Sequence, residues 1–208
     1  LRRQRQMCIR DRLKPVNLPI FPLKLVVLPG TIQGLQIFEP RYLNMVKQCM
    51  SNTSNFVISY KSDKFDDFDF GIEKVGTSVQ IVDFNNLPNG LLGITVKAES
   101  KVSLNNIIQL EDKSYLGEVL PLTEPEVDDQ SLLAKYPDLI EVLVKLKEHP
   151  EIKTLQLNID LDSADSVSYH LGNLIPLTAD EKQTLLTAFD ADQRFKILSK
   201  ILESIRKT

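Results

Sequence analysis

The sequence predicts an α+β protein in which a β-rich half is followed by a helical half. Residues 17–122 contain many short runs of β-branched residues separated by prolines and turn residues, which is the pattern of a barrel or sandwich. Residues 123–130 (TEPEVDDQ) are acidic and are expected to form a linker or the lead-in to a helix, and apolar residues recur at helical spacing beyond them. We therefore expect a β-rich domain at 13–124 and a helical subdomain at 125–208.

The β-rich half divides into short strands in order along the chain. Prolines at positions 19, 22 and 29 exclude a helix from the run LPIFPLKLVVL at 18–28, which is expected to be extended. Asn89 and Gly90 both tolerate positive φ, and they predict a tight type I′ turn between two strands. The other strands are expected at residues 35–38, 56–60, 72–84, 91–100, 100–110 and 114–122.

One helix interrupts this half, within IFEPRYLNMVKQCM at 37–50. Pro40 suits the first helical position, and the carboxylate of Glu39 favours the positive end of the helix dipole. Cys49 is expected to fill the core rather than to act as a nucleophile. The buried face is predicted from the apolar residues that recur at helical spacing, namely Leu43, Val46 and Met50.

Three or four helices follow the linker and are expected to form a small bundle. The runs at 138–149 and 164–175 each end at a proline. A capping box, in which Thr178 precedes Glu181 by three residues, predicts the start of another helix. The last helix repeats this device with Asp190 and Gln193, and its apolar stripe consists of Phe195, Leu198, Ile201, Leu202 and Ile205.

Composition and charge exclude several classes of protein. With 208 residues, 42% hydrophobic and 25% charged, the chain is neither disordered nor fibrous. Residues 1–12, which we expect to be a disordered or artefactual tail, carry a net charge of +4, so the total of −3 leaves −7 on residues 13–208. An acidic body repels phosphates, which argues against nucleic acid as a partner. No apolar run approaches the ~20 residues of a membrane span, so we expect no membrane contact. Two cysteines give no disulfide framework, so we expect a cytoplasmic protein.

The sequence singles out no catalytic, cofactor-binding or metal-ligating residue, and no cofactor is predicted. The four Cys and His residues are 41, 100 and 21 positions apart, which matches no zinc motif. Residues 160–171 begin like a calcium-binding loop, but Ala164, Asp165 and Leu171 stand where a ligand, a glycine and a glutamate are needed. No phosphate-binding loop or nucleophile motif is present. We expect His170 to lie in the helical core and the acidic run at 63–71 to be a solvated loop.

Several segments together resemble the N-terminal, substrate-binding domain of Lon protease. They are LPIFPLKLVVLPG and LQIFEPRYLNMV within 18–46, VGTSVQIVDFNNLPNGLLGITVKAESKV at 75–102 and YHLGNLIPLTADEKQTLL at 169–186. Their order, over about residues 17–206, makes the resemblance specific. It implies a PUA-like pseudo-barrel of mixed strands followed by a C-terminal helical bundle. It also implies a stand-alone, single-domain member that lacks the ATPase and peptidase modules of the protease.

The residues that carry the resemblance are expected to be structural. Glu39 and Arg41 should form charge-assisted hydrogen bonds that hold the helix on the barrel, while Phe38 and Tyr42 should pack in the core. Arg41→Ala should then lower the melting temperature, because a buried partner would remain unpaired. No substrate-binding residue is singled out. The complete set of family-motif residues is Pro29, Gly30, Phe38, Glu39, Pro40, Arg41, Tyr42, Asn89 and Gly90.

The resemblance implies a non-catalytic module that binds polypeptide, and not an enzyme. Its partners would be unfolded or degron-bearing polypeptide clients, or one dedicated protein partner. The seam between the β-rich and helical halves is the expected groove, since such interfaces commonly form concave sites. Two alternatives stay open: an RNA-binding PUA-like protein, which needs a basic stripe, and a small-molecule enzyme that uses the interdomain cleft.

Overall fold

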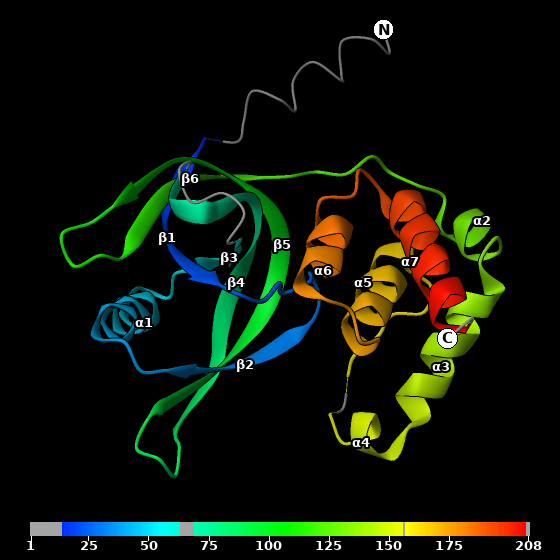
Figure 1. Cartoon of the computed structure of the whole chain (residues 1–208), viewed down its shortest axis with the longest axis horizontal. Helices are drawn as coiled ribbons and strands as arrows, with labels where there is room; N and C mark the ends of the chain where they lie inside the picture. The colour runs from blue at the N-terminus through cyan, green and yellow to red at the C-terminus, as the bar shows by residue number, and fades with distance from the viewer. Residues whose placement is uncertain (1–13, 63–68, 156, 207–208) are drawn as a thin grey trace, which may run out of the picture.

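The structure confirms an α+β chain, with a six-stranded sheet and a group of C-terminal helices (Figure 1). It is a computed structural model that describes residues 14–62, 69–155 and 157–206. The tail predicted at 1–12 and the larger part of the acidic run at 63–71 lie outside the described residues. The boundary predicted between residues 124 and 125 falls in the connection from the last strand to the first helix of the second half.

The six strands form one mixed sheet in the order β2-β5-β4-β3-β1-β6. β1 and β3 run parallel, and the other neighbours are antiparallel. Because β5 also pairs with β6, five strands close into a ring, while β2 stays at an edge with β5 as its partner. The strands are β1 (Val16–Leu23), β2 (Ile32–Ile37), β3 (Phe56–Lys61), β4 (Ile72–Asn86), β5 (Leu92–Gln109) and β6 (Tyr115–Pro121).

The β4–β5 hairpin corrects two predictions. The two strands expected at 91–100 and 100–110 are one continuous strand, β5. The turn is not type I′. That turn needs a positive φ at both Asn89 and Gly90, and only Gly90 has one, at +78°. The Gly90 N–H donates to the carbonyl of Leu87 over 2.9 Å, which puts Pro88 and Asn89 at the centre of the turn. Proline favours the first central position of a type I turn and glycine its last position, which explains the difference.

The connection from β1 to β2 joins the two halves of the molecule. The extended run predicted at 18–28 ends as a strand at Leu23, and residues 24–28 are irregular. Val26 and Leu28 pack in the core of the helices, whereas Val27 between them packs in the core of the sheet. The Thr77 hydroxyl also donates to the carbonyl of Val27 over 2.6 Å. Both cores therefore include residues of this one segment.

Helix α1 (Pro40–Asn52) packs on the sheet through a face that is rotated from the predicted one. Leu43 and Met50, predicted to be buried, are each more than a third exposed. The Tyr42 ring lies 4.1 Å from that of Phe21, centroid to centroid, and burying this large aromatic surface turns the helix. The residues of α1 that are buried share this side of the helix: Tyr42, Met45, Val46 and Cys49.

The second half consists of short helices with a common apolar core to which Leu143, Leu171, Leu185 and Phe195 contribute. Within the described ranges, no helix has the length and apolar content that a membrane crossing needs. The helices are α2 (Asp129–Leu133), α3 (Pro137–Glu148), α4 (Pro150–Lys153), α5 (Ala164–Leu174), α6 (Ala179–Leu186) and α7 (Ala191–Arg206).

The two predicted helix caps differ in completeness. Thr178 and Glu181 form the full capping box at α6. At α7 the Asp190 carboxylate accepts a hydrogen bond from the Gln193 N–H over 2.8 Å, as predicted. The Gln193 side chain, however, accepts from the N–H of Phe189 rather than from that of Asp190. Of the two hydrogen bonds predicted for this cap, the N-terminus of α7 therefore has the one that the Asp190 carboxylate accepts.

Candidate functional site

The described residues contain no group of three or more His, Cys, Asp or Glu side chains that could hold a metal ion. Cys49 is buried in the sheet core, and burial raises the pKa of its thiol. His170 is buried as predicted, and its Nδ1 lies 2.8 Å from the carbonyl oxygen of Ser166. Both residues are therefore accounted for by the packing and hydrogen bonds around them.

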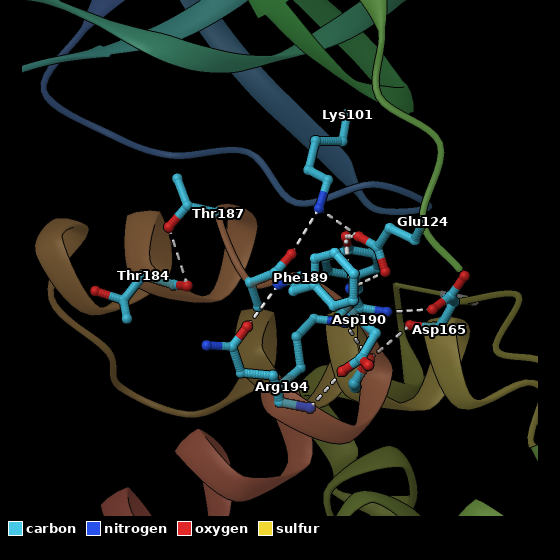
Figure 2. A network of polar contacts seen from close by, with 12 residues as sticks. Lys101, Glu124, Asp165, Thr184, Thr187, Phe189, Asp190 and Arg194 are labelled. Atoms are coloured by element: carbon cyan, nitrogen blue, oxygen red, sulfur yellow. Dashed lines mark hydrogen bonds and ion pairs between the residues drawn. The ribbon is translucent and has the colours of Figure 1, made fainter. Parts of the chain in front are cut away.

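A polar network crosses the seam between the sheet and the helices (Figure 2). Glu124, in the connection from β6 to α2, lies between two cations that come from opposite sides. Lys101 of β5 places its Nζ 2.5 Å from Glu124 Oε1 and donates to the carbonyl of Ala188 over 2.8 Å. Arg194 of α7 places its Nη1 2.5 Å from Glu124 Oε2. Strand, linker and last helix are therefore tied together by one carboxylate.

Arg194 is fully buried, and each nitrogen of its guanidinium has a partner. Its Nε donates to Ser168 Oγ over 2.9 Å, and its Nη2 forms an ion pair with Asp165. Its Nη1 also donates to the Tyr169 hydroxyl over 3.1 Å, and the guanidinium carbon lies 4.1 Å from the centre of that ring. A buried cation whose three nitrogens each have a partner fixes α5 and α7 relative to each other.

The network keeps Glu124 ionised. Burial acts to raise the pKa of Glu124, but the hydrogen bonds and positive charges of Arg194 and Lys101 outweigh it, so the pKa lies below its usual value. Burial raises the pKa of Tyr169, whose hydroxyl therefore stays protonated and donates to Glu124 Oε1 over 3.0 Å. This carboxylate is therefore ionised near neutral pH and joins the strand, the linker and the last helix.

A groove lies along the outside of this network, formed by two adjoining cavities of about 450 and 440 Å³. The two cavities share Pro29, Glu99, Asp165 and Tyr169 in their walls, which makes them one continuous surface feature. We call this feature the seam groove. The first cavity is completed by residues 100–101, 122–127, 129 and 163, and the second by Gly30, Ile32, Lys97, Leu157, Asn158, Ser166 and His170.

Apolar and acidic side chains meet in the seam groove. Leu122 and Ile32 line it and are exposed to solvent. Glu126 and Asp129 add negative charge to the first cavity, where Lys101 is already paired with Glu124. Such a groove favours a ligand that is partly apolar and not anionic.

Two of the family-motif residues lie at the seam groove. Pro29 and Gly30 form a turn in its wall. Gly30 has a φ of +79°, a conformation that is strained for residues with a side chain. A Cβ on Gly30 would lie 3.5 Å from the His170 ring, so the turn also approaches α5 closely. The remaining motif residues are not in its walls: Asn89 and Gly90 lie in the hairpin turn.

The other motif residues gather at the start of α1. Arg41 contacts Glu39 through Nε at 2.8 Å and Nη2 at 2.6 Å, and its Nη1 donates to the carbonyl of Lys113 over 2.6 Å. This contact ties α1 to the turn between β5 and β6. The Glu39 side chain is 39% exposed, however, so the expectation that Arg41 has a buried partner is wrong.

The two aromatic motif residues have opposite environments. Tyr42 is buried, as expected, and burial raises its pKa to about 12. Phe38 is 67% exposed, which contradicts the expectation that it packs in the core. It immediately follows Ile37, which is buried, and alternate residues of an extended chain point to opposite faces. Pro40 stands at the first position of α1, as predicted.

The network residues Lys101, Glu124 and Arg194 were not predicted from the sequence. One signal was present: Arg194 precedes Leu198 by four residues and Ile201 by seven, so it lies on the apolar stripe of its helix. A charged residue on such a stripe indicates a buried ion pair. No local pattern marks its partner, because Glu124 is 70 residues away in the chain.

Comparisons with known proteins place this chain beside Lon proteases. Lon protease from Brevibacillus choshinensis is 22% identical over 197 residues, which are 92% of this chain and 25% of that protein. Lon protease 1 from Thermus thermophilus is 27% identical over 216 residues, with 92% and 25% covered. The chain therefore spans about a quarter of the length of the curated relatives it matches.

Solved structures agree with this placement. A Lon N-terminal domain protein from Xanthomonas campestris superimposes with a TM-score of 0.69 and 27% identity, covering 89% of this chain and 98% of that one. The N-terminal domain of a Mycobacterium avium complex Lon protease shares the fold, with a TM-score of 0.68, 16% identity and coverage of 88% and 96%. The ATP-dependent protease La (LON) substrate-binding domain family matches residues 17–204. This chain therefore belongs to the LON substrate-binding domain family.

Proposed function

We propose that the chain binds polypeptide clients through the seam groove, as a recognition module that cleaves no peptide bond itself. The observation that carries the proposal is the groove between sheet and helices, where Leu122 and Ile32 are exposed in the walls of two adjoining cavities. Exposed apolar side chains in a concave surface are typical of sites that bind other proteins. Membership of a substrate-binding family supports the same function.

The charge of the groove suggests which clients it prefers. Glu126 and Asp129 line the first cavity, in which Lys101 is neutralised by Glu124 and Glu99 is paired with Lys97. Segments that combine apolar residues with lysine or arginine complement such a surface, whereas acidic segments are repelled. The same charge argues against RNA, whose phosphates need a basic stripe.

The test measures binding of a permanently unfolded polypeptide. Fluorescein-labelled, reduced and carboxamidomethylated lysozyme, a basic polypeptide whose blocked cysteines carry no charge, is titrated with the full chain, and fluorescence anisotropy is followed. Native lysozyme serves as the control. Saturable binding of the unfolded form alone is the expected result, whereas binding of neither form contradicts the proposal. ATP-dependent degradation of casein by the pure chain would contradict the non-catalytic part.

A pair of variants locates the site. Leu122→Asp places a charge in the first cavity and should weaken binding at least about tenfold, the effect of losing roughly 1.4 kcal/mol at the interface. Val144→Asp is the matched control, because Val144 on α3 is similarly exposed but is absent from the groove walls. Equal effects of the two variants would remove the groove from the proposal.

A further inference from the structure

We propose that the free edge of β2 binds the client backbone as an added, extended β-strand. This inference deepens the proposed function and rests on it. β2 pairs with β5 on one side, and within the part of the chain that the structure describes no strand pairs with its other side. Figure 1 shows β2 leading from the helical half towards α1. It is the strand that the closed ring leaves out.

Alternate residues of β2 direct their backbone groups away from β5. In an antiparallel pair, opposed residues alternate between positions that exchange hydrogen bonds with the partner and positions that do not. The N–H of Ala98 donates to the carbonyl of Thr31 over 2.9 Å, so Thr31 occupies a bonded position. The register with β5 is regular from Ile32 onward, so Gln33 and Leu35 also occupy bonded positions. The N–H and C=O groups of Ile32, Gly34 and Gln36 therefore point away from β5. All three residues are exposed.

β2 lacks the features that usually prevent strand addition. Edge strands are commonly protected by charged side chains, prolines or bulges. The strand IQGLQI contains no charge and no proline, and its register with β5 is regular from Ile32 to Ile37. A Cβ on Gly34 would meet nothing within 4 Å, so the face of the sheet at the middle of the strand is uncovered. The outward carbonyl of Gly34 accepts from the Gln33 side-chain amide over 2.8 Å, a bond that the N–H of an added strand would replace.

The beginning of this edge opens into the seam groove. Ile32, 52% exposed, lines the second cavity together with Lys97, which it faces across the β2–β5 pair. A strand added to β2 would carry alternate side chains along this face and could place one of them in the cavity of about 440 Å³. The N–H and C=O groups along the edge of β2 are spaced so that another extended polypeptide can pair with them. The expected occupant is therefore a polypeptide segment in an extended conformation.

Hydrogen exchange tests the proposal on the full chain. The ¹⁵N-labelled protein is saturated with unlabelled, reduced and carboxamidomethylated lysozyme, and exchange of single amides is followed by NMR. At a free polypeptide concentration of about ten times Kd, the amides of Ile32, Gly34 and Gln36 should exchange about tenfold more slowly. The amides of Gln33 and Leu35, already directed at β5, should change little. Unchanged exchange at the three outward amides overturns the proposal.

Two substitutions at one position provide a second readout. Gly34→Pro removes an outward N–H and blocks an added strand, while it leaves the bonds to β5 in place; it should weaken binding at least about tenfold. Gly34→Ala keeps the N–H and should bind within about twofold of the natural chain. If Gly34→Pro fails to fold, the exchange experiment still decides.

The outcomes separate the two proposals. If the natural chain binds the unfolded polypeptide but both Gly34 variants bind it equally well, strand addition is wrong and the seam groove stands. If the natural chain binds no unfolded polypeptide, the proposed function itself fails. Dimerisation in sedimentation experiments that protects the same three amides without any client would show that a second copy occupies the edge, and would also overturn the proposal.

Discussion

Arg194→Met should destabilise the protein strongly, because it removes the cation that Glu124, Asp165 and the Tyr169 hydroxyl share. Methionine is about as long as the aliphatic part of arginine and fills most of the same space. The substitution therefore tests the charge and the hydrogen bonds rather than the packing. The natural side chain is fully buried and Glu124 is 15% exposed, so solvent screens the ion pair between them only weakly.

The magnitude follows from the exposure of the partners. Removing one member of a buried ion pair costs about 3–5 kcal/mol, and Glu124 is 15% exposed. Lys101 remains 2.5 Å from Glu124, which keeps the loss near the lower limit. Asp165 is 60% exposed and regains water, so its share is below about 1 kcal/mol. We expect the free energy of unfolding to fall by about 3 kcal/mol, or the melting temperature by about 6–12 °C.

Urea unfolding followed by circular dichroism at pH 7 measures this loss. Lys196→Met is the matched control, because Lys196 lies on the same helix and pairs with Asp192 at 2.5 Å but is 62% exposed. Its loss should be far smaller than that of Arg194→Met, because solvent screens this exposed pair. Equal losses for the two variants, or a loss below about 1 kcal/mol for Arg194→Met, would refute the reasoning.

Three further predictions concern stability measured by the same urea unfolding. Arg41→Ala should cost only about 1 kcal/mol, because the ion pair is partly exposed; a loss above about 3 kcal/mol would contradict this. The pKa of Glu124 is lowered by folding, so its contribution is present above the unfolded pKa and is lost as pH falls through the folded pKa. The difference between the natural chain and Glu124→Gln should therefore shrink from pH 6 to lower pH, and a constant difference would disagree. Gly76→Ala should lower the free energy of unfolding by about 1–3 kcal/mol, since its Cβ would lie 2.7 Å from a backbone oxygen of β3. Gly34→Ala places its Cβ in open space and should lower it by less than about 0.5 kcal/mol. Equal losses for the two variants would count against the steric argument.

Features that depend on neighbours in the chain were predictable. The capping box of Thr178 and Glu181 needs residues three positions apart, and the structure contains it in full. The prolines and β-branched runs placed the strands in the first half, and the helical periodicity placed α3, α5, α6 and α7 in the second, whereas the short helices α2 and α4 were not predicted. Each of these signals acts within a few residues, so a pattern in the sequence is sufficient to detect it.

Features that depend on what packs against an element were predicted less well. The spacing of Leu43, Val46 and Met50 is helical, but of the three only Val46 is buried, because the contact of Tyr42 with Phe21 rotates the buried face of α1. The exposure of Phe38 is of the same kind, because an aromatic residue at the end of a strand has a buried and an exposed alternative. Periodicity shows which residues share a face, while only the neighbouring element decides which face is covered.

The sequence by itself therefore determined the class of fold, the division into a strand-rich and a helical half, the limits of the longer helices and the family resemblance. Tertiary structure alone decided the seam: Lys101 meets the carbonyl of Ala188 across 87 residues, and Arg194 meets Glu124 across 70. It also decided that β5 pairs with β6 and leaves β2 at a free edge. The physical reason is that such contacts close long loops of chain, and no residue near either partner in the sequence records where the other will lie.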